Sequence, residues 1–237
     1  SYTFHKADDY RVLKGIVFDD HFTDTYTMDI REIQKSAESI VFECKIRSMT
    51  AQGKPRYHYS ATIELRRDLP TPPVYADMDL TPRNPFAGDG LYHDGTLFHG
   101  AFFQGVKQVL SLDENRLVMQ CLAPVLDDYQ QGQFPIQTFN PIGADIAFQA
   151  MVIWARKIYD AGSLPLSAGG GMLYRIIPPN TPFYVTLQVK RHDSAGLVAD
   201  IITHDETGTL YHVVHDAEVT ISTELNHLFR PSAFQTR

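Results

Sequence analysis

The sequence predicts an α+β protein in which antiparallel strands surround one long buried helix. Two observations lead to this prediction. Most of the chain consists of short segments rich in β-branched and aromatic residues, and turn residues separate these segments. The segment 141–160, by contrast, has the length and the continuous apolar character of a buried helix. Two predicted strands precede this segment and four follow it, which indicates a sheet wrapped around a central helix.

Residues 1–68 show strand patterns without a helix of useful length. Apolar and polar residues alternate along these strands, so that Tyr26, Met28 and Ile30, for example, share one face. The four predicted strands are 10–18, 25–33, 39–47 and 56–65. A meander of this kind has one apolar face that needs a cover. The cover must come from a segment before Ser1, from the second half of the chain or from a partner chain.

A Pro-rich stretch, residues 69–90, separates the two halves and holds five of the fourteen prolines. Proline and glycine favour extended and irregular backbone. We therefore expect this stretch to be a connection that runs over the surface.

Residues 91–237 should contain the central helix and the strands that surround it. Asn140 can cap the helix, and Pro141 suits its first turn. Ala161 and Gly162 should end it. The strands predicted around it are 105–112, 115–122, 171–177, 182–190, 196–204 and 210–221.

Composition excludes several classes of function. Hydrophobic residues make up 43% of the chain and charged residues 21%, which is ordinary for a globular domain. The formal net charge is -7 and no run of Lys or Arg occurs, which disfavours nucleic-acid binding. The longest apolar segment is too short and too interrupted to span a bilayer, and the start of the chain lacks the features of a signal peptide. Cys44 and Cys121 lie in apolar stretches, so we expect two reduced core cysteines in a cytoplasmic protein rather than a disulfide.

Asp145 is the most informative residue of the predicted helix. From Pro141 to Ala155 the segment is apolar except for Asp145 and Gln149. Residues four apart share one face of a helix. Since an unpaired buried carboxylate is costly, a protein that keeps one in an apolar helix is expected to use its proton.

Three motifs give the chain a resemblance to a known family. Leu97–Gly105 is similar to the Leu-Phe-His-Gly-Pro-x-Phe-Gln signature of polyketide synthase dehydratase domains, and Asp145-x-x-x-Gln149 matches their Asp-x-x-x-Gln/His motif. Asp8–Asp19 resembles a segment of the synthases of polyunsaturated fatty acids. The resemblance covers essentially the whole chain. It implies a double hotdog fold, which has two antiparallel sheets wrapped around central helices.

Two departures from the family pattern matter. Ala101 replaces the proline of the signature, so the turn after Gly100 should be less rigid. None of the ten histidines fits the His-x-x-x-Gly-x-x-x-x-Pro motif, which in the family carries the catalytic histidine before the first central helix. We therefore expect residues 1–68 to be a first hotdog without its N-terminal strand and central helix. Residues 69–90 would then be the linker, and residues 91–237 the second hotdog.

The resemblance implies a dehydratase domain of a multidomain polyketide or polyunsaturated fatty acid synthase, in which a 3-hydroxyacyl chain loses water. The family histidine takes the α-proton, Asp145 helps the β-hydroxyl to leave, and Gln149 orients the Asp145 carboxyl. The substrate-binding residues that it implies are Phe98, His99, Gly100, Phe103 and Gln104. The substrate is carried on the phosphopantetheine of an acyl carrier protein, with no cofactor or metal bound to the chain itself. Other domains of the same synthase, and a second copy of the chain, are further expected partners.

Several of these residues also have a simpler structural interpretation. Asp145 could serve only as a cap or a partner of the helix dipole, and His99 could make a structural hydrogen bond. His212-x-x-His215 has a metal-like spacing, but on a strand these two side chains point to opposite faces. Gly169–Gly171 lacks the context of a phosphate loop and indicates a flexible connection. Four aromatic residues are more typical of a core than of a tunnel lining: Tyr92, Phe98, Phe102 and Phe103.

Fold alone does not separate the dehydratase from two other classes of function. The first alternative is a non-catalytic pseudo-dehydratase that acts as a scaffold of the synthase or binds its acyl carrier, and the absence of the histidine motif motivates it. The second alternative is a hotdog thioesterase, which shares the fold but matches the motifs less well.

Overall fold

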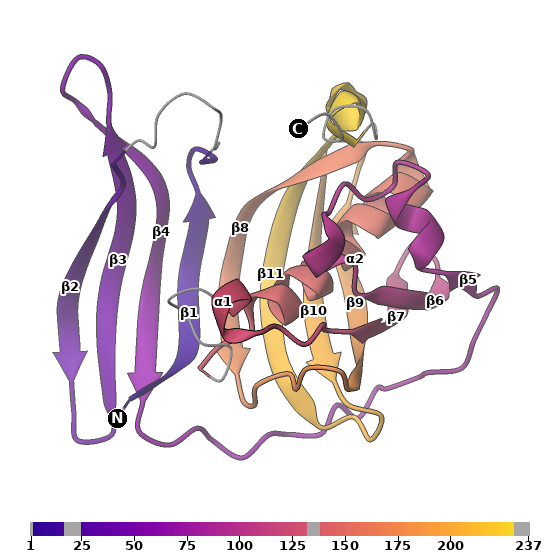
Figure 1. Cartoon of the computed structure of the whole chain (residues 1–237), viewed down its shortest axis with the longest axis horizontal. Helices are drawn as coiled ribbons and strands as arrows, with labels where there is room; N and C mark the ends of the chain where they lie inside the picture. Colours follow the sequence, from indigo (N-terminus) through magenta and orange to yellow (C-terminus); the bar gives the residue numbers. More distant parts are fainter. Residues whose placement is uncertain (1, 17–24, 132–137, 230–237) are drawn as a thin grey trace.

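The computed structural model describes residues 2–16, 25–131 and 138–229. In these ranges eleven antiparallel strands form one sheet, in the order β2-β3-β4-β1-β8-β11-β10-β9-β7-β6-β5 (Figure 1). The strands are β1 (Thr3–Val12), β2 (Thr27–Lys35), β3 (Ser39–Met49), β4 (Pro55–Arg66), β5 (Phe86–Ala87), β6 (Val106–Leu112), β7 (Arg116–Leu122), β8 (Gly162–Leu173), β9 (Pro182–His192), β10 (Gly196–His204) and β11 (Leu210–Ser222). The helices are α1 (Asp128–Gln131), α2 (Pro141–Tyr159) and the short 3-10 helices η1 (Asp89–Tyr92), η2 (Ala101–Phe103) and η3 (Thr223–Phe229).

The single sheet differs from the two separate sheets expected from the sequence. β1 of the first half pairs with β8 of the second half, which sets Ala7 opposite Gly171 and Tyr10 opposite Ala168. Without this pairing, both strands would be sheet edges with unpaired backbone groups. The two halves therefore share one continuous hydrogen-bonded framework.

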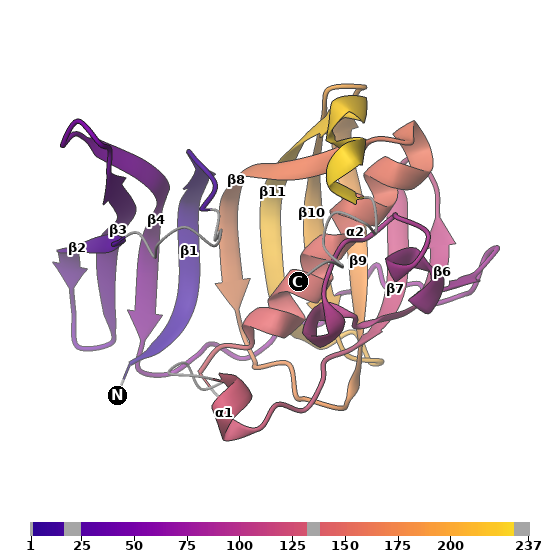
Figure 2. The same ribbon diagram turned by 45° about the horizontal axis from the view of Figure 1, so that its top comes forward.

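Helix α2 lies in the concave side of the curved sheet, as predicted for the second half (Figures 1 and 2). The Asn140 side chain accepts a hydrogen bond from the Gly143 backbone N–H, and Pro141 is the first helical residue. The helix ends one residue before the predicted boundary. Asp160, with φ of 49°, takes the left-handed conformation expected of a glycine at a helix C-terminus.

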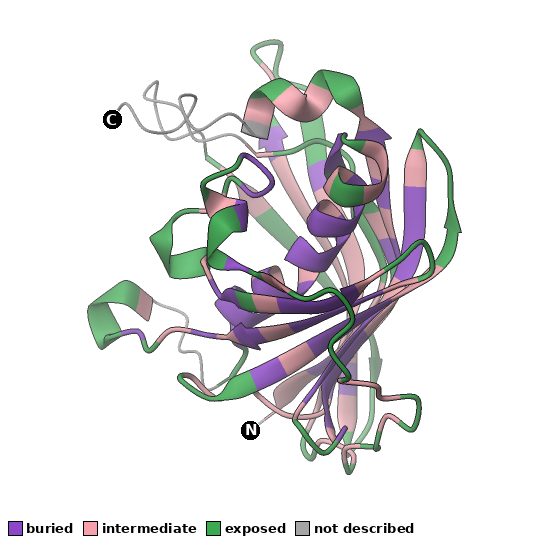
Figure 3. Cartoon of the chain, turned by 90° about the vertical axis from the view of Figure 1, so that its right-hand side faces the viewer, coloured by how far each residue is buried: buried purple, intermediate pink, exposed green. Residues whose placement is uncertain are grey.

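The core lies between α2 and the strands that wrap it. Figure 3 shows the buried residues concentrated on this helix and on the strands around it. Trp154 is fully buried there, and its indole N–H donates to the carbonyl of Asp113 at 2.9 Å. Gly105 allows the chain to pass close to α2, because a Cβ atom at this position would lie 2.2 Å from Cδ1 of Ile146. These contacts fix the position of the helix relative to the sheet.

Strands β2, β3 and β4 form a meander as predicted, but β1 pairs with β4 and not with β2, so the four strands do not follow one another in the sheet. One face of these four strands is apolar and uncovered. The register aligns Phe42 with Ile63 and Ile63 with Ala7. Met28 and Ile30, on the outermost strand, are 58% and 57% exposed. In the described part of the chain no helix packs on this face (Figure 2). The continuation of the same face lies against α2 in the second half.

Strand β1 is placed differently from the prediction of 10–18. It covers Thr3–Val12, and residues 17 and 18 lie outside the described residues. Asp9 has a φ of 49°, and the register with β4 shifts between Asp8 and Arg11. This irregularity breaks the alternation of apolar and polar residues that would have revealed the strand.

The prediction of a flexible connection at Gly169–Gly171 was wrong. These residues lie inside β8, which begins at Gly162 instead of 171 and pairs with both β1 and β11. A Cβ atom at Gly170 would lie 2.8 Å from an oxygen of Asp8, so the absence of a side chain allows close packing there. Glycine and proline have low strand propensity, which explains why the pattern did not predict this strand.

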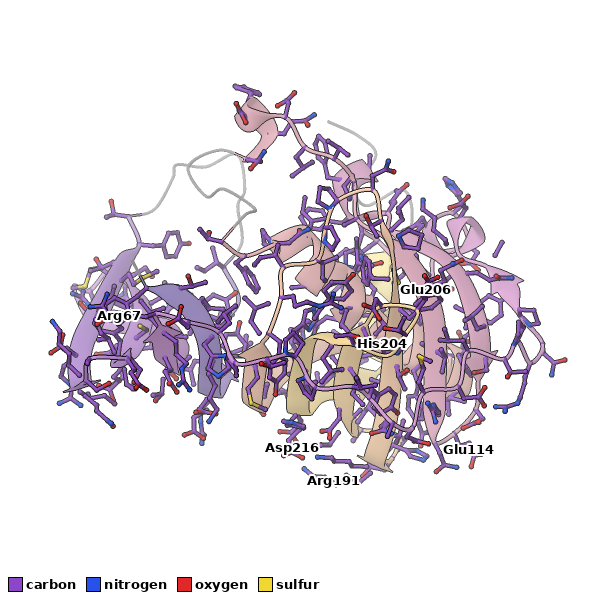
Figure 4. All side chains as sticks on the ribbon, turned by 90° about the horizontal axis from the view of Figure 1, so that it is seen from below. Arg67, Glu114, Arg191, His204, Glu206 and Asp216 are labelled. Atoms are coloured by element: carbon purple, nitrogen blue, oxygen red, sulfur yellow. The ribbon has the colours of Figure 1, made fainter. Side chains whose placement is uncertain are left out.

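The Pro-rich connection crosses the outside of the sheet, and β5 lies within its predicted range of 69–90. Tyr75 packs against His204, with the two ring centroids 5.6 Å apart. The Tyr75 hydroxyl accepts hydrogen bonds from Gln188 and Arg116. Figure 4 shows this side of the molecule, with Arg67 at the start of the connection and His204 along its path.

Among the described residues, no helix combines the length and apolar character needed to cross a bilayer.

Candidate active site

A cavity of about 500 Å³ lies between α2 and the inner face of β1, β8 and β11. Most of the side chains that line it are apolar. Those from α2 and the segment before η2 are Phe98, His99, Ala144, Asp145, Phe148, Gln149, Met151 and Val152. The first half contributes Phe4, Ala7 and Tyr10. The cavity is thus a joint product of both halves, and it contains the two residues predicted to be catalytic.

Asp145 and Gln149 are in direct contact on the cavity side of α2. The Gln149 Nε2 donates to Oδ2 of Asp145 at 3.0 Å, as the four-residue spacing predicted. Gln149 is 1% exposed, whereas the Asp145 side chain is 38% exposed. The carboxyl is therefore at the surface of the cavity and is less buried than the apolar sequence around it suggested.

His99 lies beside the same carboxyl. Its Nε2 is 3.6 Å from Oδ2 of Asp145, which is too long for a hydrogen bond. The ring stacks on Phe98 with centroids 4.4 Å apart, and its Nδ1 is buried without a partner in the described residues. Burial lowers the pKa of His99 below its ordinary value, although the neighbouring Asp145 opposes this effect. Burial therefore favours the neutral form of the imidazole.

The other predicted substrate-binding residues lie in the same loop but do not line the cavity. Gly100 precedes η2 in extended conformation, and no atom lies within 4 Å of the place where its Cβ would be. The carbonyl of Phe103 accepts a hydrogen bond from Gln149 Nε2 at 2.8 Å. Gln104 donates from its side chain to the carbonyl of His99 at 3.0 Å and so closes the loop. In this structure the three residues shape the loop that holds His99.

The sequence did not identify several residues of the site. Tyr92 packs against the core, as expected, and in addition its hydroxyl donates to Oε1 of Gln149 at 2.7 Å. The need of a buried tyrosine hydroxyl for a partner was the available signal. Phe4, Ala7 and Tyr10 reach the cavity only through the β1–β8 pairing, which nothing in the local sequence indicates.

The two histidines with metal-like spacing do not converge. His212 lines the cavity, and its Nε2 is buried without a partner in the described residues. His215 instead contacts Oδ2 of Asp200 at 3.1 Å. Within the described ranges, no group of three or more His, Cys, Asp or Glu side chains is arranged to hold a metal.

The arrangement is suited to moving a proton. One oxygen of Asp145, Oδ2, accepts the amide N–H of Gln149. The other oxygen, Oδ1, has no hydrogen-bond partner among the described residues. A carboxyl held in this way can give a proton to a hydroxyl group in the cavity, or take one from it.

Solved dehydratase domains share this architecture. A dehydratase domain of a trans-AT polyketide synthase from Brevibacillus brevis matches with a TM-score of 0.70 and 15% identity, over 93% of this chain and 76% of that one. The dehydratase domain of RzxB from Pseudomonas fluorescens matches with a TM-score of 0.68 and 12% identity, over 91% and 75% of the two chains. Similarity at this level establishes the fold, and it confirms the hotdog-type dehydratase fold predicted from the sequence.

Sequence comparison identifies the family. One subunit of the polyunsaturated fatty acid synthase of Thraustochytrium sp. is 30% identical over 218 residues, which is 89% of this chain but only 8% of that longer protein. The family model described as the polyketide synthase dehydratase N-terminal domain matches residues 76–227. This match spans more than half of the sequence and includes every residue of the Asp145 site that lies in the second half. The chain belongs to the polyketide synthase dehydratase family.

Proposed function

We propose that the chain is the dehydratase part of a multidomain synthase, and that it eliminates water from a 3-hydroxyacyl thioester carried by an acyl carrier protein. The observation that supports this most is the Asp145 carboxyl on the wall of an apolar cavity. Along β8 the cavity lining runs from Ser163 to Leu173, which corresponds to roughly 30 Å of strand. An elongated, mostly apolar cavity with a carboxyl on its wall suits a long acyl chain that reacts at one position.

The proposed elimination divides the work between a base and an acid. The base takes the proton from the α-carbon, and the electrons of that C–H bond form the double bond to the β-carbon. The bond between the β-carbon and its oxygen breaks, and Asp145 gives its proton to the departing hydroxyl, which leaves as water. The thioester stays intact, and the acyl group arrives on phosphopantetheine. The reaction needs no further cofactor bound to this chain, because it moves only protons and releases water.

The family resemblance assigns the base to a histidine just before a first central helix, and we propose that this helix, in the longer protein, covers the apolar face of β1 to β4. That face continues the cavity wall through Ala7 and Tyr10, so a helix packed on it would border the Asp145 site. The solved domains support this proposal, since 24–25% of each lies outside the match to this chain. With this helix in place, the architecture would be the full double hotdog.

Cysteine labelling tests the proposed cover. Cys44 lies on the apolar face, where the register sets it between Ile30 and Ala61, and it is partly exposed. We expect a thiol reagent to label Cys44 in this chain but to label it at least about 10-fold more slowly in the longer protein, because a packed helix restricts access. Cys121 is fully buried and serves as an internal control that stays unlabelled in both. Equal labelling rates of Cys44 in the two proteins would overturn the proposed cover.

The activity is tested with Asp145→Asn in the longer protein that contains this chain. The substrate is a 3-hydroxyacyl thioester on the acyl carrier protein, and the product is detected by mass spectrometry as the loss of water. Removal of a general acid should lower kcat by at least ~10²-fold. Asp128→Asn is the matched control, because Asp128 is exposed in α1 and does not line the cavity.

Each outcome of this experiment separates the candidate functions. Undiminished turnover of Asp145→Asn would overturn the role assigned to Asp145. A wild-type protein that binds the acyl carrier but forms no enoyl product would support the scaffold function instead. Release of free thiol without loss of water would indicate a thioesterase.

A further inference from the structure

We propose that Tyr92 is a positioning residue, which acts through Gln149 to determine which oxygen of Asp145 carries the proton. The consequence for catalysis rests on the proposed dehydratase function. The positioning itself does not, because it follows from the hydrogen bonds around Gln149.

Four hydrogen bonds connect Tyr92 to Asp145 and anchor both to the backbone. The backbone N–H of Val106 donates to the Tyr92 hydroxyl oxygen at 3.0 Å, and that hydroxyl donates to Oε1 of Gln149 at 2.7 Å. The Nε2 of Gln149 donates to Oδ2 of Asp145 at 3.0 Å and to the carbonyl of Phe103 at 2.8 Å. The chain of contacts thus links η1, β6, η2 and α2 in one network.

The direction of this network is fixed at both ends. The N–H of Val106 can only donate, so the Tyr92 oxygen must accept it and its own proton is directed to Gln149. The carbonyl of Phe103 can only accept, so the group of Gln149 that faces it must be the NH₂ group. Both ends require the same orientation of the Gln149 amide. The hydrogen-bonding partners of this amide therefore assign its oxygen and its nitrogen.

Burial makes this orientation the favoured one. Gln149 is 1% exposed, so water cannot replace a lost partner of its amide. Burial also raises the pKa of Tyr92, which keeps the hydroxyl protonated and able to donate. A reversed amide would turn its NH₂ group toward the Tyr92 hydroxyl and its oxygen toward two acceptors, the Phe103 carbonyl and Asp145.

The consequence for Asp145 concerns its two oxygens. Because Oδ2 accepts the amide N–H of Gln149, a proton on the carboxyl belongs on Oδ1. The network joins Tyr92 to Asp145 only through Gln149, so Tyr92 does not touch the substrate by way of these hydrogen bonds. Its role is to hold in place the Gln149 amide that binds Asp145. Gln149 supplies the N–H, and Tyr92, together with the Phe103 carbonyl, holds the amide so that it presents an N–H and not an oxygen to Asp145.

The positioning is tested by NMR on the chain itself, without any assay of activity. We measure solvent exchange of the Gln149 side-chain NH₂ protons, and we assign that signal by its loss in Gln149→Met. In the wild type these protons should exchange at least ~10-fold more slowly than those of exposed Gln52, since each makes a hydrogen bond in a buried site. Tyr92→Phe should speed the exchange at Gln149 by about 10-fold, the equivalent of one hydrogen bond.

Tyr184→Phe is the matched control for the loss of one tyrosine hydroxyl. Its hydroxyl accepts a hydrogen bond from Gln120 at 3.2 Å and takes no part in the network of Tyr92. Exchange at Gln149 should be unchanged in this variant. Equal exchange rates of Gln149 in Tyr92→Phe and wild type would overturn the proposal. If Tyr92→Phe does not fold, the wild type alone still tests the proposal. Side-chain NH₂ protons of Gln149 that exchange as fast as those of Gln52 would overturn it.

Turnover in the longer protein tests the catalytic consequence. Tyr92→Phe and Gln149→Met should each lower kcat by about 10-fold or more while KM changes little, and the double variant should be no slower than Gln149→Met alone. The two effects should not combine, because Tyr92 acts only through Gln149. If the two substitutions caused independent structural defects, their decreases in kcat would multiply. A multiplicative effect would overturn the proposed route through Gln149. If exchange at Gln149 responds as expected but the wild type dehydrates no substrate, the proposed function fails and the positioning stands.

Discussion

Replacement of Gly105 by alanine is expected to destabilise the protein by pushing α2 away from the sheet. A Cβ atom at this position would lie 2.2 Å from Cδ1 and 2.8 Å from Cγ1 of Ile146, and 2.8 Å from the carbonyl oxygen of Leu122. Ordinary contacts of a Cβ atom begin at 3.4 Å. Either Ile146 or the backbone must therefore move by more than about 1 Å, which the fully buried position of Ile146 resists.

The expected loss of stability in Gly105→Ala follows from the general response of protein cores to added volume. Overpacking of a close-packed site costs about 1–3 kcal/mol, and the backbone contact at Leu122 puts Gly105→Ala in the upper half of that range. Ile146→Val removes the Cδ1 atom, which makes the shortest contact, and by itself should cost about 0.5–1.5 kcal/mol. The double variant should be less destabilised than the sum of the two by about 1 kcal/mol, because the main overlap is gone.

Urea unfolding measures these differences, with the fluorescence of Trp154 as the signal. Trp154 is the only tryptophan of the chain and is fully buried on the same helix, α2. Gly100→Ala is the control in the same segment, because no atom lies near its Cβ position and its extended backbone suits any residue. That variant should be as stable as the wild type or more stable by up to ~1 kcal/mol. A Gly105→Ala protein with unchanged stability, or strictly additive effects with Ile146→Val, would refute the reasoning.

Two further predictions concern acid stability. Burial lowers the pKa of His212 to about 4. Between about pH 6.5 and pH 4 the unfolded chain therefore binds a proton that the folded chain excludes. As the pH decreases through this window, the free energy of unfolding decreases by up to ~3 kcal/mol. His212→Leu should remove this dependence in urea unfolding at pH 7 and 5, and an identical slope in both proteins would contradict it. Burial acts to raise the pKa of Asp205, but hydrogen bonds from Thr207 and Arg175 outweigh it and lower the value to about 2. The stability contributed by the Asp205 carboxylate should be complete above about pH 4 and lost as the pH decreases toward 2. In Asp205→Asn this acid-induced loss should be smaller by about 1 kcal/mol, a modest value because the site is accessible to solvent. Acid unfolding of Asp205→Asn that is the same as that of the wild type would refute this prediction.

The parts of the fold that local patterns encode were predictable from the sequence. The central helix was predicted because a long apolar segment follows Asn140, whose side chain caps it. The two strands that the sequence misplaced, β1 and β8, are the ones that depend on each other. Their segments carry an irregular residue, Asp9, and a run of glycines, so they are strands because of their pairing and not because of their own propensity.

The candidate site divides in the same way. Asp145 and Gln149 were predictable because their spacing on one helix fixes their contact. Tyr92 was not, since its partner lies 57 residues away and the contact depends on how η1 packs against α2. The side chains from β1 were beyond prediction for the same reason, because a contact between halves leaves no local periodicity.

The irregularity at Asp9 has a consequence for how the cavity can change. Ala7 and Tyr10 both line the cavity, although residues three apart in a regular strand point to opposite faces. The left-handed Asp9 supplies the extra residue that brings both to the same side. Removal of that one residue would turn either Ala7 or Tyr10 out of the cavity without altering any side chain. Along this wall, therefore, the room available to an acyl chain is governed by the length of the strand as much as by the identity of its residues.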